Sequence, residues 1–509
     1  MAPTFCSRCG DAVEEGCDLR DELGELDALL ERLKLKRYDL TRKINQLYSP
    51  IVHHLSPDVT STIFEFCLPD FTDHQLSPDT KEDISIPLSL GAICSYWRDI
   101  AWSTPSLWSS LVVRVTSKHD TYIVTGIAQE WLARSGQLPL SIRIYSQVYE
   151  HKAIPALADI VNQYSPRWSD LDLYIHPSYY QHFHATDNYA PILKSIRFYC
   201  SAAYGDIQDL NVQLTCPRLE RANLSHYYRM AETNIQWDNL THLTLHSMCN
   251  NDSLFILRNT PRLVFCKVSG YCPGYNSSSI GELVLTSLRS LQLTTDYAEA
   301  FLNNLIAPHL EEFSLPSFCY KPPMTFIRLV TFFLRRSACS LRSFSMIFSN
   351  IPPYIESFMD LLQRMPSLNT LSMISKNITP ADCDPGEILQ LVAKVLSSQS
   401  TSQQGFLPNL KILEYTGMLH LRPGNYDDLY PLPPADNTVH RPFHLLKLNL
   451  DQYPIPKNMI SYISILEGQG LTVKFKSKDN LQSSVDYFRN KEESLCRDWA
   501  DNLDSSLLS

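Results

Sequence analysis

The stretches LTHLTL at residues 240–245 and LRSLQL at residues 288–293 place leucine at the first, fourth and sixth of six positions. The same spacing, with Phe, Met, Tyr or Ala replacing some leucines, recurs in units that begin at Leu219, Leu240, Leu288, Leu310, Leu341, Leu368, Leu410 and Leu445. Weaker copies begin at Trp168, Leu193 and Leu263. Successive units start 25, 26, 21, 23, 25, 22, 31, 27, 42 and 35 residues apart. A pattern repeated eleven times indicates a structural period rather than chance.

This period predicts the fold of most of the chain. A spacing in the twenties with this leucine pattern is typical of leucine-rich repeats, in which each unit contributes one short strand. The leucines of one unit are buried only when the next unit stacks on it, so we expect an α/β solenoid with a curved parallel sheet over residues 112–475. Apolar runs predict its first strands at Leu111-Val112-Val113 and Leu140-Ile142-Ile144, and its last strand at Leu471-Val473-Phe475.

Two further predictions concern the end of the chain. The proline-rich stretch 422–442 is expected to be a loop. Residues 476–509 carry apolar side chains at mostly helical spacing, which predicts either a helix that caps the last strand or a tail that binds a partner. These apolar side chains are Leu481, Val485, Phe488, Leu495, Trp499 and Leu503.

The residues that alternate with the inward leucines are expected on the concave surface of the solenoid. Eleven strands spaced about 4.8 Å apart extend over roughly 50 Å, which suits another protein better than a small molecule. Tyr and Arg dominate protein interfaces. The candidate substrate-binding residues, for an acidic or phosphorylated segment, are therefore Tyr174, Arg197, Tyr199 and Arg221. The alternative is that these are ordinary solvated strand residues.

A second periodicity lies upstream, in residues 18–48. Apolar residues alternate at spacings of four and three, interrupted by Arg37, at Leu19, Leu23, Leu26, Leu30, Leu33, Leu40, Ile44 and Leu47. This pattern predicts a coiled-coil-like helix of about four heptads, acidic in its first half and basic in its second. The sequence is compatible with two arrangements of this helix: self-association with residues 18–48 of a second copy, and packing against the rest of the same chain. Residues 1–17 are expected to form a flexible N-terminus.

Residues 55–108 hold a dense apolar segment between these two regions. The stretches 58–67 and 88–103 are predicted to be helices with few charged residues. The stretch 69–87, with Pro78 and four Asp, is predicted to be a polar loop between them. A helical piece of about 50 residues is marginal alone, so a partner or the rest of the chain is expected to cover its apolar surface.

Within this segment a set of motifs stands out: Leu55-x-Pro57-Asp58-Val59, Ile63-Phe64, Leu68, Ile93-Cys94-x-x-Trp97-Arg98 and Pro105-x-Leu107-Trp108, preceded by Ser49-Pro50-Ile51. With these motifs the segment resembles an F-box, and in detail it is similar to the fungal set of F-box proteins. The resemblance implies an all-α F-box over residues 50–111 that docks on the small adaptor subunit of an SCF-type ligase. The adaptor-binding residues that it implies are Leu55, Pro57, Ile63, Phe64, Leu68, Leu88, Cys94, Trp97 and Trp108.

On this resemblance the chain is the substrate-recognition subunit of an SCF-type cullin-RING ubiquitin ligase, in the pathway of ubiquitin-like conjugation. The F-box would bind the adaptor and thereby the cullin scaffold, while the repeats hold a protein substrate. The chain is then not an enzyme and needs no cofactor, because its contribution is proximity. The alternative is a coiled-coil and leucine-rich-repeat scaffold or regulatory protein that binds partners without any ligase.

Charge and composition narrow the classes of partner. The 44 basic and 54 acidic residues leave a net charge of −10, which argues against nucleic acid and anionic membranes as partners. No run approaches the roughly 18 apolar residues that a membrane-spanning helix requires. The 14 cysteines are spread over the chain, and no apolar signal segment precedes Cys6. We therefore expect no disulfides and a cytoplasmic or nuclear location.

One cluster of potential metal ligands is visible, formed by Cys6, Cys9 and Cys17. It is an incomplete zinc site, because a fourth ligand would have to come from His53, His54 or a second chain. A redox pair and a plain flexible terminus are the alternatives, and no metal is assigned. No nucleophile elbow, phosphate-binding glycine loop or His-Glu-x-x-His helix is present, so no catalytic residues are predicted.

Overall fold

The computed structural model divides the chain into two compact units, unit 1 (Met1–Tyr145) and unit 2 (Ser146–Ser509). Unit 1 is mainly helical, whereas unit 2 is built on a large sheet. The residues that the structure describes are 14–48, 54–69, 85–148, 151–200, 208–210, 212–225, 228–229, 233–270, 281–295, 298–315, 323–348, 355–375, 406–416, 445–449, 472–476 and 481–483.

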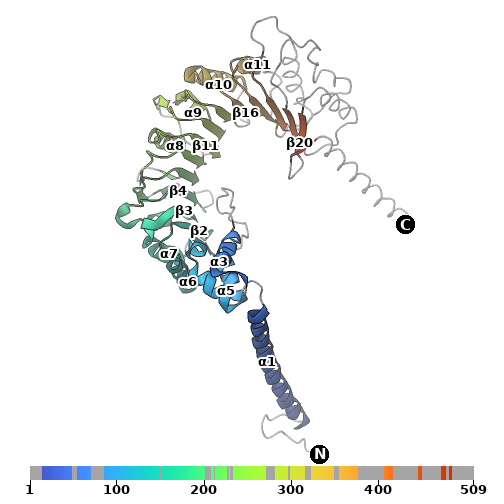
Figure 1. The fold of residues 1–509 in the computed structure, drawn as a ribbon. Coiled ribbons are helices and arrows are strands. Elements are labelled where there is room, and N and C mark those ends of the chain that lie inside the picture. Colours follow the sequence, from blue (N-terminus) through green and yellow to red (C-terminus); the bar gives the residue numbers. More distant parts are fainter. Residues whose placement is uncertain are drawn as a thin grey trace, which may run out of the picture. The chain divides into compact units, whose positions relative to one another are not determined.

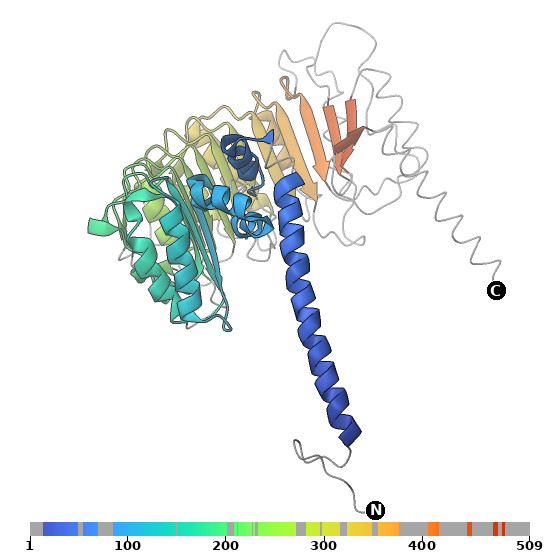
Figure 2. The ribbon, with the colours of Figure 1, turned by 60° about the horizontal axis from the view of Figure 1, so that its bottom comes forward.

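Unit 1 begins with a single long helix, α1 (Glu14–Tyr48), which Figure 2 shows as an uninterrupted rod. The helix starts at Glu14, so the predicted boundary at residue 18 is four residues too late. Residues 21–44 are exposed throughout. None of the helices in the described ranges is both long enough and apolar enough to cross a membrane.

The rest of unit 1 consists of short helices and two strands. Ser56 caps the first of these helices, because its Oγ accepts a hydrogen bond from the Val59 amide at 3.4 Å, and Pro57 occupies the first turn. The elements are α3 (Pro57–Phe66), α4 (Ile86–Ile93), α5 (Ser95–Ser103), the 3₁₀ turn η1 (Pro105–Trp108), β1 (Ser110–Val115), α6 (Thr121–Arg134) and β2 (Leu140–Ser146).

The single helix predicted over residues 88–103 is wrong, because the chain breaks at Cys94. The backbone of Cys94 is extended, with φ −157° and ψ 169°, which ends α4. Its Sγ then accepts a hydrogen bond from the Trp97 amide at 3.4 Å and caps α5. Both halves are apolar, so the sequence pattern runs through the break. Residues 70–84 of the predicted loop lie outside the described residues, and Pro87 belongs to the first turn of α4.

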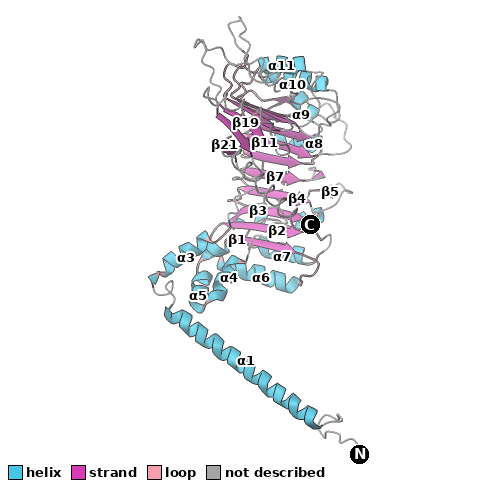
Figure 3. Ribbon diagram, turned by 90° about the vertical axis from the view of Figure 1, so that its right-hand side faces the viewer, coloured by secondary structure: helices cyan, strands magenta, loops and turns pink. Residues whose placement is uncertain are grey.

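Unit 2 is built on an open sheet whose strands follow one another in chain order, as Figure 3 shows. The predicted parallel sheet is confirmed, with an antiparallel final pair, β20 and β21. The strands are β3 (Trp168–Ile175), β4 (Ser195–Cys200), β7 (Arg221–Ser225), β10 (His242–His246), β11 (Phe265–Gly270), β13 (Ser290–Thr295), β15 (Glu312–Leu315), β16 (Ser343–Phe348), β17 (Thr370–Ser375), β18 (Ile412–Thr416), β19 (Leu445–Asn449), β20 (Thr472–Lys476) and β21 (Leu481–Ser483).

The register of this sheet places the fourth residue of successive units in one row. Every member of the row is buried, so the leucine pattern forms the core of the unit. The row contains Leu171, Ile196, Ala222, Leu243, Cys266, Leu291, Phe313, Phe344, Leu371 and Leu413.

Helices lie along one side of the sheet of unit 2, as Figure 1 shows for α8, α9 and α10. The helices are α7 (Ala153–Asn162), α8 (Asn250–Arg258), α9 (Ala298–Asn304), α10 (Pro323–Ser337) and α11 (Ile355–Gln363), with 3₁₀ turns at Ser165–Arg167, Pro177–His182 and Thr186–Asn188. Short parallel pairs join β5 (Gln208–Asp209) to β8 (Tyr228–Arg229), β6 (Gln213–Leu214) to β9 (Asn234–Ile235) and β12 (Leu283–Val284) to β14 (Leu305–Ile306).

Two predictions near the end of the chain are wrong. In the unit that begins at Leu445, the residues aligned with Leu413 and Tyr415 are Leu446 and Leu448, so the predicted register is shifted by two. A two-residue shift keeps each side chain on its face, so alternation does not detect it. Leu481, predicted to start a helix, lies in strand β21 and covers the edge of β20. The predicted loop at 422–442 and residues 484–509 lie outside the described residues.

Candidate functional site

Aromatic side chains form the centre of unit 1. The rings of Phe64 on α3 and Trp97 on α5 lie 4.8 Å apart between centroids. Trp108 packs edge-on against Trp102 at 5.3 Å and against Trp131 at 4.8 Å. Phe64 is 1% exposed and Trp108 is fully buried. These contacts join α3, α5, η1 and α6 into one core.

The indole of Trp108 is held in place by polar contacts as well. Its Nε1 donates a hydrogen bond to the Ala101 carbonyl at 2.7 Å. The Arg134 guanidinium lies 5.3 Å from the Trp102 ring centroid and 5.1 Å from that of Trp108. Gly91 on α4 packs directly on Trp102, since a Cβ there would lie 1.9 Å from Cζ3 of the ring. The orientation of α4 and α5 is thus determined by this core.

On the outside, α3 and α4 leave several large apolar side chains uncovered. Val59, Ile63 and Phe66 on α3 are 47%, 42% and 86% exposed, and Leu88 and Ile93 on α4 are 42% and 56% exposed. We call these five residues the exposed apolar set. On α3 they are spaced four and three residues apart, as members of one helix face are. Large apolar side chains that stay exposed on short helices are candidates for a protein-binding surface.

The predicted adaptor-binding residues therefore fall into three groups. Pro57, Ile63 and Leu88 are exposed, whereas Leu55, Leu68, Cys94 and Trp97 are partly buried. For Phe64 and Trp108 the prediction needs correction, because both side chains fill the core and are not accessible to a partner. The site prediction omitted Val59, Phe66 and Ile93. Val59 and Phe66 could have been predicted from their spacing, because they share one helix face with Ile63.

In unit 2, polar residues alternate with the buried row on the first strands of the sheet. One register row holds Asp170, Ser195, Arg221, His242 and Phe265, and the next holds Asp172, Arg197, Asn223, Thr244 and Lys267. A third row begins with the neighbours Tyr174 and Tyr199. We call these three rows the polar face. It brings together all four residues predicted to bind a substrate, Tyr174, Arg197, Tyr199 and Arg221.

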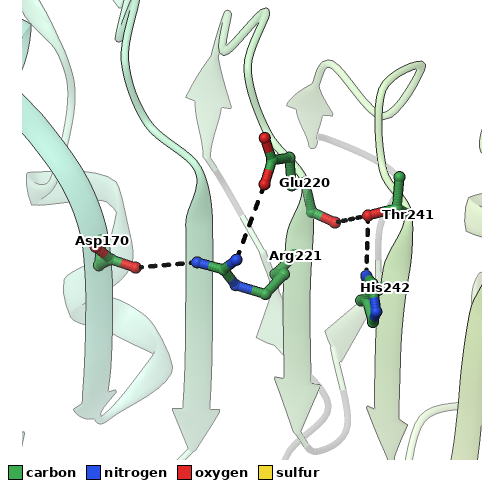
Figure 4. Close-up of polar contacts among 5 residues, drawn as sticks. All are labelled: Asp170, Glu220, Arg221, Thr241 and His242. Atoms are coloured by element: carbon green, nitrogen blue, oxygen red, sulfur yellow. Dashed lines mark hydrogen bonds and ion pairs between the residues drawn. The ribbon is translucent and has the colours of Figure 1, made fainter. Parts of the chain in front are cut away.

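Both arginines of the polar face have carboxylate partners. Arg221 extends one Nη to Asp170 Oδ1 at 3.6 Å, across strand β4, and the other to Glu220 Oε2 at 3.8 Å, as Figure 4 shows. Arg197 Nη1 lies 3.6 Å from Asp172 Oδ2, and both side chains are largely buried. Three carboxylates thus surround two guanidinium groups, and the local charge is not positive. This arrangement gives little electrostatic support to the predicted acidic or phosphorylated ligand.

Tyr199 connects the second and third rows. Its hydroxyl accepts a hydrogen bond from Asn223 Nδ2 at 2.6 Å, and its ring lies 6.3 Å from that of Tyr174. Burial, and then the charge of Asp172, raise the pKa of Tyr199 to about 12, so the phenol is neutral at physiological pH. Among the described residues, Asn223 Oδ1 and Arg221 Nε are buried without a hydrogen-bond partner. Both atoms lie beneath the surface of the polar face.

His242 extends the polar face to strand β10. Its Nδ1 lies 2.9 Å from the Thr241 hydroxyl, which in turn is 3.0 Å from the Glu220 carbonyl (Figure 4). The imidazole stacks on Phe265 of the next strand, with ring centroids 5.9 Å apart. The site prediction omitted His242 and Asn223, although they occupy the third and fifth positions of their repeat units and so flank the buried fourth position, as Arg221 does.

Within the described ranges, no group of three or more His, Cys, Asp or Glu side chains is placed to hold a metal ion. Cys17 lies in helix α1, and Cys6 and Cys9 lie outside the described residues. The polar face offers aromatic rings, an amide, an imidazole and compensated ion pairs, which are the groups that recognise a polypeptide.

No protein-family model matches the chain, and no curated protein sequence matches it. What the chain does is therefore inferred from its own residues.

Proposed function

We propose that this chain is the substrate-recognition subunit of an SCF-type cullin-RING ubiquitin ligase. In this proposal unit 1 contains an F-box that binds the adaptor subunit, and unit 2 is a leucine-rich-repeat solenoid that holds a protein substrate. The observation that carries the proposal is the exposed apolar set on α3 and α4, which lies within the segment that resembles an F-box.

The exposed apolar set supports docking on a foreign subunit for an energetic reason. Full burial of one large apolar side chain contributes about 1.5 to 3 kcal/mol. Phe66, at 86% exposure, has the most to gain, and Ile93 and Val59 are each about half exposed. Burial of all five residues would contribute several kcal/mol toward the cost of association, which is about 4 to 15 kcal/mol, and the rest of the interface must supply the remainder.

The buried aromatic residues have a different role in this proposal. The partly buried Trp97 packs on Phe64 and joins α5 to α3, and the buried Trp108 joins α5 to α6, so these residues position the exposed apolar set without forming it. Substitution of Trp108 would therefore weaken adaptor binding indirectly, through the fold of unit 1. Substitutions at exposed positions test the contact itself.

The regular register of unit 2 supports the solenoid. Ten successive units place their fourth residues in one buried row, which is what stacking of identical repeats requires. The polar face is the proposed substrate site. Tyr174 and Arg221 are its partly exposed anchors, since Arg197 is mostly buried in its pair with Asp172.

Two matched variants test the adaptor contact. Ile63→Asp combined with Phe66→Asp places two charges in the exposed apolar set, and we expect the full chain to lose adaptor in co-purification. The control is Ile123→Asp on α6, because Ile123 is 59% exposed and lies outside the set. The control should retain adaptor, and thermal unfolding should show that both variants remain folded.

Two results would overturn this proposal. One is a wild-type chain that co-purifies with other partners but never with adaptor or cullin, as the scaffold alternative predicts. The other is a double variant that retains adaptor as well as the control does. The substrate site is tested separately: Tyr174→Ala with Arg221→Ala should lose co-purified substrate while adaptor binding is unchanged.

A further inference from the structure

We propose that α1 pairs with α1 of a second copy of the chain as an antiparallel two-stranded coiled coil. The inference goes beyond the proposed function and does not depend on it, because α1 lies upstream of the exposed apolar set. It rests on the exposure of the helix, on the position of one arginine in its apolar seam and on the distribution of charge beside that seam.

The apolar seam of α1 is uncovered by the described part of the chain. Its members Leu23, Leu26, Leu30, Leu33, Leu40 and Ile44 are between 50% and 59% exposed. The helix has 35 residues, and so is about 52 Å long. A row of exposed apolar residues over that length, interrupted only by Arg37, is stable in water when a second surface of the same length and period covers it.

The position of Arg37 distinguishes the two orientations that a pair of such helices can take. In the heptad, Leu23, Leu30, Arg37 and Ile44 occupy position a, and the leucines between them occupy position d. In a parallel pair, position a faces position a, so Arg37 would face Arg37 of the second copy inside the seam. In an antiparallel pair, position a faces position d, so Arg37 lies opposite Leu26 of the second copy, within the acidic half of that helix.

The charges that flank the seam favour the same orientation. In a parallel pair, Glu22 at position g lies beside Asp27 at position e of the second copy, which places like charges together. In an antiparallel pair that overlaps the whole seam, Glu22 lies beside Lys43 of the second copy, and Asp27 lies beside Lys34. Each attractive pair occurs twice by symmetry. The acidic half of each helix thus meets the basic half of the other.

The ion pair that Lys34 makes within its own helix does not prevent this contact. Lys34 Nζ lies 2.7 Å from Glu31 Oε1, and both side chains are more than 60% exposed. An exposed pair of this kind contributes little to stability, so Lys34 is available to share its charge with a second carboxylate.

One substitution gives opposite results for the two orientations. In the antiparallel pair, Asp27→Lys places a second lysine beside Lys34, and we expect the dissociation constant of the dimer, measured on the full chain by analytical ultracentrifugation, to rise about tenfold. In a parallel pair the introduced lysine would lie beside Glu22, and the dimer would tighten. Added salt should reduce the difference between variant and wild type.

A control and a rescue variant complete the test. Asp21→Lys changes the net charge equally but lies at position f, away from the seam, and should leave the dissociation constant unchanged. Asp27→Lys with Lys34→Asp restores the attraction and should restore the dimer. A wild-type chain that stays monomeric, a tighter dimer in Asp27→Lys, or equal weakening by Asp21→Lys would each overturn the proposal.

Discussion

Replacing Gly91 with alanine should destabilise α4 and α5, although alanine is the better helix former. An ideal Cβ on Gly91 would lie 1.9 Å from Cζ3 and 2.5 Å from Cη2 of Trp102. The ring of Trp102 has little freedom to move, because Trp108 packs against it at 5.3 Å and the Arg134 guanidinium lies 5.3 Å from its centroid. The extra methyl group must therefore push α4 away from α5.

The size of the effect follows from two opposing contributions. Overpacking of a core costs up to about 3 kcal/mol, and a clash this close belongs at that upper end. The higher helix propensity of alanine stabilises the helix by about 1 kcal/mol relative to glycine and offsets part of this cost. The free energy of local opening should thus fall by about 2 kcal/mol, which corresponds to roughly 30-fold faster amide exchange in peptides that cover residues 86–103. Hydrogen–deuterium exchange with mass spectrometry on the full chain measures this rate.

Gly126 on α6 provides the matched control. A Cβ at Gly126 meets no atom within 4 Å, so Gly126→Ala should stabilise α6 by up to about 1 kcal/mol and slow its exchange. The same chemical change is thus expected to have opposite signs at the two glycines. Exchange in Gly91→Ala that is as slow as in wild type would refute the packing of α4 on Trp102.

Three further predictions concern unit 2. Arg197→Ala removes the guanidinium 3.6 Å from the buried Asp172 and should lower the free energy of unfolding in denaturant by about 1 to 3 kcal/mol. Burial lowers the pKa of His176, whose Nδ1 accepts a hydrogen bond from the Ser178 amide. The free energy of unfolding should therefore fall as the pH drops below about 6.5. His176→Asn should flatten this pH dependence in denaturant titrations. Because the pKa of Tyr199 is raised to about 12, stability should also fall as the pH rises from about 10 to 12, and Tyr199→Phe should remove that loss.

Each of these predictions has an outcome that contradicts it. Unchanged stability in Arg197→Ala would mean that the pair with Asp172 contributes nothing to the fold. Identical pH profiles of wild type and His176→Asn would show that His176 titrates normally. An ultraviolet titration in which wild type and Tyr199→Phe differ by one phenol already near pH 10 would place the hydroxyl of Tyr199 in water.

Features that repeat along the chain were predictable from sequence. The units that begin at Trp168 to Leu410 take the predicted register. The reason is that every unit repeats the same local pattern, in which apolar and polar residues alternate and one face is buried. The helix of α1 was predictable for the same reason, since its four-and-three spacing continues over several heptads. Errors appear where a single residue departs from the pattern: Cys94 divides an apolar run into two helices, and Leu446 takes the place expected for Leu448.

The candidate sites were only partly predictable. The apolar character of residues 55–108 indicated a surface in need of cover, yet Ile63 and Phe64 are adjacent, apolar and equally fit for the core or the surface. Only packing against Trp97 buries Phe64 and leaves Ile63 exposed. Likewise the sequence indicated Arg221 as a candidate substrate-binding residue, whereas the sheet places Asp170, two strands away, beside its guanidinium.

By itself, therefore, the sequence determined the repeated strands of unit 2, the long N-terminal helix and the strip of polar residues beside the buried leucines. Their cause is periodic and lies within a few residues along the chain. Only the tertiary structure decided that Trp108 fills the core, that Phe66 is exposed and that Arg197 and Arg221 are already paired with carboxylates. Those outcomes depend on contacts between residues far apart in sequence, because burial and charge compensation are properties of the packed surroundings.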